Sequence, residues 1–204
     1  QDEPLADWVC IPLYFVSKLA HDNGVKGVQV GEGSDEQFCG YKSYMGYLQL
    51  YHKYWSPFRS YLPKPLQKMA AMMARGASGF DPRIPVYADI IDRAARDREH
   101  FWSGAMVFWN TSKDRLVNYA ALGSSAGHKP MIDAGVLDAS YLEPDSYNVI
   151  SSFLTPFDRA HPGQDALTRM IHNEFRLRLP ELLLMRVDKI SMSVSLEARV
   201  PFLD

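Results

Sequence analysis

The sequence predicts a mostly α-helical chain with one short, buried strand of the parallel α/β type. Most of the chain carries apolar residues at helical spacing, interrupted by glycine and proline breaks. Residues 25–30 differ, because they form a short apolar run that ends at Gly31 and is followed by a helical pattern. A strand, a glycine turn and a helix N-terminus in this order are typical of an α/β unit that binds ligands at the carboxyl end of its strand.

Composition and charge describe an ordinary globular domain. The 204 residues are 47% hydrophobic and 23% charged, with a net charge of -2, which gives no reason to expect nucleic acid. Within them we find neither a signal-peptide pattern nor an apolar run of the roughly 18 residues that a membrane span needs. The two cysteines, Cys10 and Cys39, have neither disulfide-framework nor zinc-ligand spacing, so we expect a reducing, cytoplasmic compartment.

The first half of the chain predicts two helices around the strand. Residues 11–20 have helical apolar spacing, and Gly24 suits a left-handed cap after them. A helix is expected over residues 38–55, where five tyrosines recur at steps of three or four. We expect this stripe to face the core or to line a groove: Tyr41, Tyr44, Tyr47, Tyr51 and Tyr54.

The second half predicts further helices separated by loops. Residues 87–100 are rich in charge, which indicates a solvated helical face. Residues 123–130 consist largely of small residues and are expected to form a loop, since they lack phosphate-loop spacing. The other expected helices cover residues 66–75, 114–122, 146–153 and 165–177.

The glycine turn, residues 31–36, is the first candidate site. Gly31 and Gly33 permit a tight turn and close approach of a ligand, and Ser34 and Asp35 are good N-cap residues. A helix N-terminus suits phosphate. The acids of the turn, including Glu32, are explained if a divalent metal bridges acid and phosphate, or if one acid accepts a proton. The alternative is a solvated turn whose acids only favour the helix N-terminus.

Three segments together resemble the synthetase domain of glutamine-dependent asparagine synthetases. Residues 2–7 read D-E-P-L-A-D, as in the family's D-E-P-x-A-D. Residues 30–41 read V-G-E-G-S-D-E-Q-F-C-G-Y, where the family has roughly S-G-E-G-S/A-D-E-x-F-G-G-Y. Residues 184–204 end in D-K-I-S-M-S-V-S-L-E-A-R-V-P-F-L-D, which matches the family's D-K-x-S-M-x-x-S-L-E-x-R-V-P-F-L-D.

This resemblance implies a fold and a domain organisation. Residues 1–204 would be part of a synthetase domain of the α/β ATP-pyrophosphatase type, similar to the adenine nucleotide α-hydrolases, with few of its parallel strands present. The resemblance places a glutaminase domain and an S-G-G-x-D-S ATP loop before residue 1, and more helix after Asp204. We therefore expect the isolated chain to be inactive. Oligomerisation is left open.

The resemblance also implies an activity and a set of roles. The family activates a carboxylate, aspartate, as an acyl-adenylate with ATP and Mg²⁺, releases pyrophosphate, and amidates the carboxylate with ammonia derived from glutamine. Lys189 matches the lysine that contacts pyrophosphate, and Glu32 matches a glutamate implicated in adenylate formation and the ammonia step. Asp35 matches a position associated with magnesium and pyrophosphate. The nucleotide would be bordered by Val30, Gly31, Gly33 and Ser34.

Two departures from the family pattern leave the acceptor open. Val30 replaces a serine, which removes a hydroxyl near the nucleotide, and Cys39 replaces a glycine and is expected to be a small buried helix residue. Relatives of the fold amidate other carboxylates or close β-lactam rings. A non-catalytic helical binding module is the alternative from another class, and Lys189 would then be a surface lysine. We expect Glu197 and Arg199 to form a buried structural pair.

Overall fold

The computed structural model describes residues 7–81, 83–104, 106, 108–118, 121, 128–136 and 145–204. It divides into two compact units, Gln1–Gly46 with Leu167–Asp204 (unit 1) and Tyr47–Ala166 (unit 2). In the described part of the chain, every helix is too short or too polar to cross a membrane. Each unit is described by itself below.

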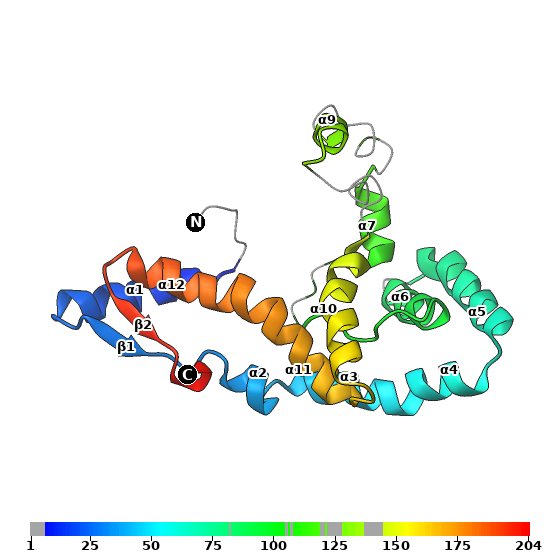
Figure 1. Ribbon diagram of the computed structural model, residues 1–204, viewed down its shortest axis with the longest axis horizontal. Helices are drawn as coiled ribbons and strands as arrows, with labels where there is room; N and C mark the ends of the chain where they lie inside the picture. The colour runs from blue at the N-terminus through cyan, green and yellow to red at the C-terminus, as the bar shows by residue number, and fades with distance from the viewer. Residues whose placement is uncertain are drawn as a thin grey trace. The chain divides into compact units, whose positions relative to one another are not determined.

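Unit 1 contains the small parallel sheet and the helices that pack around it (Figure 1). Its elements are α1 (Cys10–Asp22), β1 (Gly27–Gln29), α2 (Ser34–Phe38), the start of α3 (Lys42–Leu50), most of α11 (Ala166–Arg176), the π-helix η4 (Leu179–Leu184), α12 (Met185–Met192), β2 (Glu197–Arg199) and the 3₁₀ turn η5 (Pro201–Leu203).

The regular elements in the described residues of unit 2 are all helical. Its elements are the π-helix η1 (Tyr51–Trp55), α4 (Ser56–Tyr61), α5 (Lys64–Gly76), the 3₁₀ turn η2 (Ala77–Gly79), α6 (Ile84–Ala95), α7 (Asn110–Leu116), α9 (His128–Asp133) and α10 (Ser146–Ala160). The loop expected over residues 123–130 lies mostly outside the described residues, and its last three residues begin α9.

The expected strand is present and a second strand pairs with it, but the expectation that it is buried is wrong, because Gly27 and Gln29 are exposed and Val28 is half-buried. β1 and β2 run parallel, with Val28 opposite Ala198. β2 comes from the C-terminal motif and was not predicted as a strand. The expectation of a buried Glu197–Arg199 pair is wrong: the two side chains form an ion pair of 3.0 Å, but they are 60% and 69% exposed. Side chains alternate between the two faces of a strand, so Glu197 and Arg199 lie on the same face of β2, which points away from the helix that packs on it.

The helix before the strand is confirmed as α1, which packs against α12. The apolar side chains of α1 do not form a buried core face: Ile11, Phe15 and Leu19 are each more than 60% exposed. The two-stranded sheet offers them little apolar surface. Ser17 is the residue that α1 buries most completely.

Unit 1 is also held by a chain of polar contacts inside its core. The Tyr44 hydroxyl donates to Glu174 Oε2 at 2.6 Å, and Arg178 Nη1 donates to the same oxygen at 3.2 Å. The Arg178 guanidinium lies 4.3 Å from the centre of the Tyr41 ring, and the Tyr41 hydroxyl donates to Glu36 at 2.7 Å. Burial raises the pKa of both tyrosines, so their hydroxyls stay protonated donors.

The single helix expected over residues 38–55 is interrupted. α2 ends at Phe38, and Cys39 adopts the left-handed conformation with φ 58° and ψ 40°. Cys39 is therefore a helix cap, and the expectation of a small buried helix residue is wrong. Farther on, the wider turn of η1 changes which residue faces inward. Trp55 is 3% exposed whereas Tyr54 is 61% exposed, so Tyr54 does not face the core, but it lines an open apolar pocket together with Trp55 and Phe58, as the groove alternative expects.

The expectation of a solvated, charged helix over residues 87–100 is met at Arg96, which is 51% exposed and pairs with Asp92 four residues earlier, but it is wrong for the inner charges. Within α6, Asp89, Asp92 and Arg93 are buried, because each has a partner. The Arg93 guanidinium lies 3.7 Å from the centre of the Trp102 ring, and Asp89 accepts the Thr111 backbone N–H at 3.0 Å. Burial lowers the pKa of Arg93 to about 10, which still leaves it charged at neutral pH.

We predict that His100 makes unit 2 sensitive to mild acid. Its side chain is buried, and three aromatic rings meet the imidazole with centroids 4.9–5.8 Å away: Tyr47, Tyr51 and Trp55. Burial, with the charge of Arg93, lowers its pKa from 6.5 to about 4. The unfolded chain therefore binds the proton more tightly, and stability is lost as pH falls from 6.5 towards 4, by up to about 3 kcal/mol.

Urea unfolding of the chain and of His100→Leu at pH 7 and at pH 4 tests this. The chain is expected to lose more stability than the variant over this interval. Equal losses in the two proteins would contradict a neutral, buried His100.

We predict that Cys39→Gly stabilises unit 1 by about 1 kcal/mol, because glycine enters the left-handed conformation without a Cβ clash. Cys39→Ala is the matched control, since it removes the thiol but keeps the Cβ, and it is expected to bring no gain. The free energy of unfolding of the three proteins is the measurement. A gain in Cys39→Ala equal to that in Cys39→Gly would show that the thiol, and not the backbone, carries the cost.

Candidate functional site

The glycine turn follows directly from β1. The Val30 N–H donates to the Arg199 carbonyl oxygen at 2.9 Å, so pairing with β2 continues to the first residue of the turn. The expectation of a Ser34 N-cap is wrong. Gly33 occupies the cap position, and the Ser34 hydroxyl instead donates back to the Gly31 carbonyl oxygen at 2.6 Å. This bond closes the turn before α2 begins.

Two glycines of this region are required by close contacts. Gly33 has φ 89°, and a Cβ there would lie 2.5 Å from the side chain of Leu203. The last motif of the sequence therefore packs directly on the glycine turn. Gly40 is covered by Asp35, because a Cβ on Gly40 would lie 1.9 Å from the Asp35 carboxylate. Asp35 is thus placed at the start of α2 with its carboxylate over Gly40.

Glu32 lies beside a buried arginine that links three distant segments. Arg186 Nη2 donates to Glu32 Oε1 at 3.2 Å, across 154 residues of sequence. Arg186 Nη1 forms an ion pair with the carboxylate of Asp7, 179 residues away. The side chains of Arg186, Asp7 and Glu32 are only 10%, 17% and 22% exposed. We call these three residues the Arg186 cluster.

The electrostatics of the Arg186 cluster favour charged groups. Burial alone would raise the pKa of Asp7, but the Val9 N–H, which donates to it at 3.0 Å, and the Arg186 guanidinium together hold that pKa below its usual value. Burial alone would lower the pKa of Arg186, and the carboxylates of Asp7 and Glu32 raise it instead. Asp7 and Arg186 are therefore both ionised at neutral pH, which compensates their burial.

Lys189 lies on α12 one turn after Arg186, and it is partly exposed. Residues three apart on a helix are neighbours on its surface. The helix that carries Lys189 is thus the helix that binds Glu32 through Arg186. The structure brings the acid of the glycine turn next to the Lys189 helix. Val30, Gly31, Gly33 and Ser34 belong to the connection between β1 and α2, two elements that are labelled in Figure 1.

Sequence reasoning assigned no role to Asp7 or Arg186. Arg186 stands in an apolar run, Leu182-Leu183-Leu184-Met185, and a lone cation there indicates a buried group that needs acidic partners. Asp7 closes the D-E-P-x-A-D motif, whose other residues lie outside the described part of the chain. These two signals were present, but the sequence does not show which acids the arginine meets.

A magnesium site would depend on Asp35 together with a ligand. Within the described residues, no group of three or more His, Cys, Asp or Glu side chains could hold a metal ion. Mg²⁺ commonly takes only one or two protein carboxylates and completes its shell with water and phosphate oxygens. Asp35 is exposed, so its carboxylate fits such a shared site.

Comparisons with known proteins agree with the motifs. The family model described as asparagine synthase matches residues 1–204. A Mycobacterium tuberculosis protein (strain ATCC 25618 / H37Rv), provisionally named asparagine synthetase (glutamine-hydrolyzing), is 30% identical over 203 residues, which cover 100% of this chain and 26% of the relative. Asparagine synthetase (glutamine-hydrolyzing) 1 of Bacillus subtilis (strain 168) is 29% identical over 205 residues, or 100% of this chain and 27% of the relative.

The chain thus spans about a quarter of the length of these curated relatives. No solved structure matches it significantly. The family model covers every residue of this chain. The three motifs of the chain are in contact, because Arg186 binds Asp7 and Glu32 and because Leu203 packs on Gly33. The chain belongs to the asparagine synthase family.

Proposed function

We propose that this chain is part of an ATP-dependent, glutamine-hydrolysing amidotransferase that activates a carboxylate, in the first instance aspartate. The observation that carries this proposal is the contact of Glu32 with Arg186, because it joins the acid of the glycine turn to the helix of Lys189. The names of the curated relatives support the same activity.

The chemistry requires activation of the acceptor, since a carboxylate oxygen is a poor leaving group. The acceptor oxygen attacks the α-phosphorus of ATP, so that an acyl-adenylate forms and pyrophosphate leaves. Ammonia then attacks the acyl carbon, AMP leaves with the oxygen, and the added nitrogen gives up a proton. Lys189 offers a compact positive charge for the departing pyrophosphate. Asp35 would hold Mg²⁺, which neutralises phosphate charge when it is bound.

Glu32 is the base that we propose for the ammonia step, and Arg186 is its positioning residue. The ion pair keeps the Glu32 carboxylate oriented towards α12, the helix that carries Lys189. Asp7 holds the other side of the same guanidinium. The backbone of Val30, Gly31, Gly33 and Ser34 would border the nucleotide.

The remaining partners follow from the same proposal. A glutaminase domain of the same protein would supply ammonia from glutamine. The acceptor could be a carboxylate other than aspartate, because Val30 replaces a serine of the family pattern. Cys10 and Cys39 are both free thiols, which fits the cytoplasmic location that we propose.

We predict that Glu32→Gln lowers amide synthesis by about 10²–10⁴-fold, because the amide keeps the shape of the side chain but cannot accept the proton. Lys189→Ala is expected to lower pyrophosphate release. The assay needs a protein of the relatives' length that carries this chain, and it measures pyrophosphate release, amide formation and glutamine hydrolysis separately.

Cys39→Gly is the control for this experiment, since Cys39 caps a helix and is expected to affect stability and not rate. Glutamine hydrolysis should change less than amide synthesis in both site variants. If Glu32→Gln keeps amide synthesis within about threefold of the parent, Glu32 is not the base.

A further inference from the structure

We propose that a cavity between α5 and α6 binds a small molecule through a phosphate group. The cavity has a volume of about 440 Å³, which lies in the usual range of small-molecule sites. Three cationic side chains and one acidic side chain line it: Lys68, Arg75, Arg96 and Asp92. We call it the basic cavity. None of these residues belongs to the family motifs quoted above, and the inference does not depend on the proposed function.

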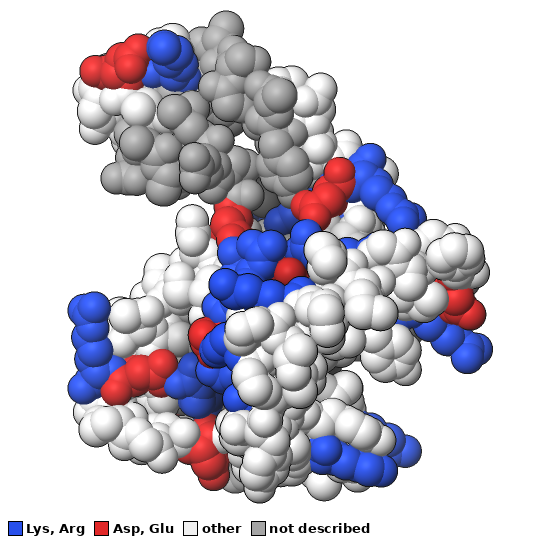
Figure 2. All heavy atoms as spheres, turned by 90° about the vertical axis from the view of Figure 1, so that its right-hand side faces the viewer, with Lys and Arg blue, Asp and Glu red and all other residues white. Residues whose placement is uncertain are grey.

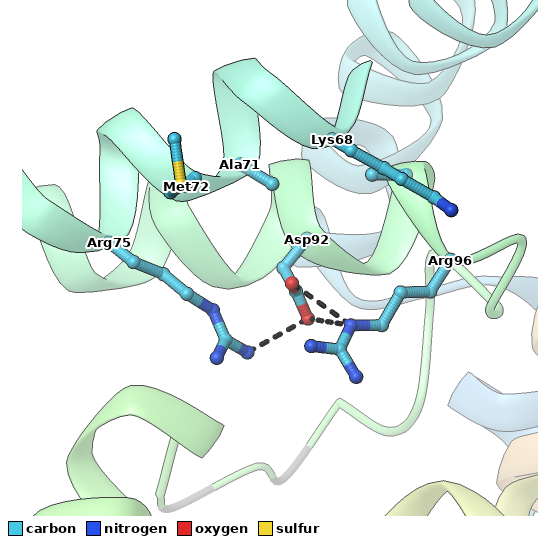
Figure 3. A pocket seen from close by; sticks show the side chains of 7 residues that line it. Lys68, Ala71, Met72, Arg75, Asp92 and Arg96 are labelled. Carbon is cyan, nitrogen blue, oxygen red and sulfur yellow. Dashed lines mark hydrogen bonds and ion pairs between the residues drawn. The ribbon is translucent and has the colours of Figure 1, made fainter. Parts of the chain in front are cut away.

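Asp92 fixes the two arginines of the basic cavity. Its Oδ2 atom accepts from Arg75 Nη2 at 2.9 Å and lies 3.0 Å from Arg96 Nε. Figure 3 shows the two guanidinium groups on either side of this carboxylate. The Asp92 side chain is only 9% exposed, whereas those of Arg75 and Arg96 are 38% and 51% exposed. A buried acid therefore holds two accessible cations in place before any ligand arrives.

The two arginines retain donors for a ligand. Arg75 uses Nη2 and Arg96 uses Nε for Asp92, so a further terminal nitrogen of Arg75 and both terminal nitrogens of Arg96 are not needed for that contact. Paired guanidinium N–H groups match the oxygens of a phosphate, and lysine adds a point charge. Lys68 also lines the basic cavity, and Figure 3 shows its side chain extending from α5.

The charge around the basic cavity favours an anion. One carboxylate against three cations leaves a net charge of +2 (3 − 1) on its walls. The chain from residue 37 to residue 80, which includes α5, contains no Asp or Glu, and its basic residues are Lys42, Lys53, Arg59, Lys64, Lys68 and Arg75. Basic side chains are also prominent on the face shown in Figure 2. An anionic group is therefore preferred to a neutral or cationic one.

The walls of the basic cavity belong to two firmly packed helices. Ala71 of α5 and Ala95 of α6 are each only 4% exposed, and such small side chains let the helices approach closely. Lys68 and Arg75 are seven residues apart on α5, so they share one face, and Asp92 of α6 pairs with Arg96, the residue that caps the C-terminus of α6. The charged groups thus stand on rigid elements, which favours a defined geometry.

The test is a calorimetric titration of the 204-residue chain with inorganic phosphate at constant ionic strength, followed by the same titration with pyrophosphate and with aspartate. We expect saturable binding of phosphate at one site. Lys68→Gln and Arg96→Gln should each weaken it by roughly tenfold, as the loss of one charge-assisted hydrogen bond does. Both side chains are substantially exposed, and circular dichroism would verify that the variants fold.

Lys53→Gln is the matched control, because it removes one charge from the same acid-free segment outside the basic cavity. Its affinity for phosphate should stay within about twofold of the parent. The proposal is overturned if phosphate does not saturate, or if Lys53→Gln weakens binding as much as Lys68→Gln does, which would indicate diffuse attraction. It is also overturned if aspartate binds more tightly than phosphate and Lys68→Gln weakens that aspartate binding, because the basic cavity would then select carboxylates.

Discussion

The ion pairs of Arg186 are the interaction on which unit 1 depends. A single guanidinium, 10% exposed, contacts Asp7 near the start of α1 and Glu32 in the glycine turn. Both acids lie more than 150 residues away in sequence, so the pairing joins the beginning, the turn and the end of the chain. Removing one partner would leave an uncompensated buried charge, which is costly. Structure and proposed chemistry thus share the same three side chains.

Other buried charges of the protein follow the same rule. Glu174 is fully buried and is satisfied by the Tyr44 hydroxyl and by Arg178. Arg93 in unit 2 is buried between the rings of Trp102 and Trp109, 3.7 and 5.1 Å from their centres. Each of these groups is charged or strongly polar, and each has a partner from a distant part of the sequence or from an aromatic side chain.

This dependence on distant partners explains how much could be predicted from the sequence. The strand after residue 25, the glycine turn and the helix α1 follow from local patterns, and they are present. The strand β2 was missed because Glu197-Ala198-Arg199 carries no apolar run, and its pairing partner lies far away in the sequence. The charges of α6 were interpreted as solvated because their partners, such as Trp102, are not adjacent to them in sequence.

The candidate site shows the same division. Glu32, Asp35 and Lys189 could be selected because they stand at motif positions, whereas the contact of Glu32 with Arg186, on the helix of Lys189, required the fold. A local feature was also missed at Cys39. This residue stands where the family has glycine and adopts a left-handed backbone conformation, which residue spacing does not reveal. Motifs therefore point to candidate residues, and the packing determines which of them lie close together.

The most direct test of the account is a double-mutant cycle on Asp7 and Arg186, because their pairing joins segments 179 residues apart. The free energy of unfolding would be measured for the parent, Asp7→Asn, Arg186→Gln and the double variant. We predict a coupling energy between Asp7 and Arg186 of about 1–3 kcal/mol. The second substitution should lower the free energy of unfolding far less once the first is present. Losses that add to within about 0.5 kcal/mol would contradict it, since they would show that the two side chains do not interact.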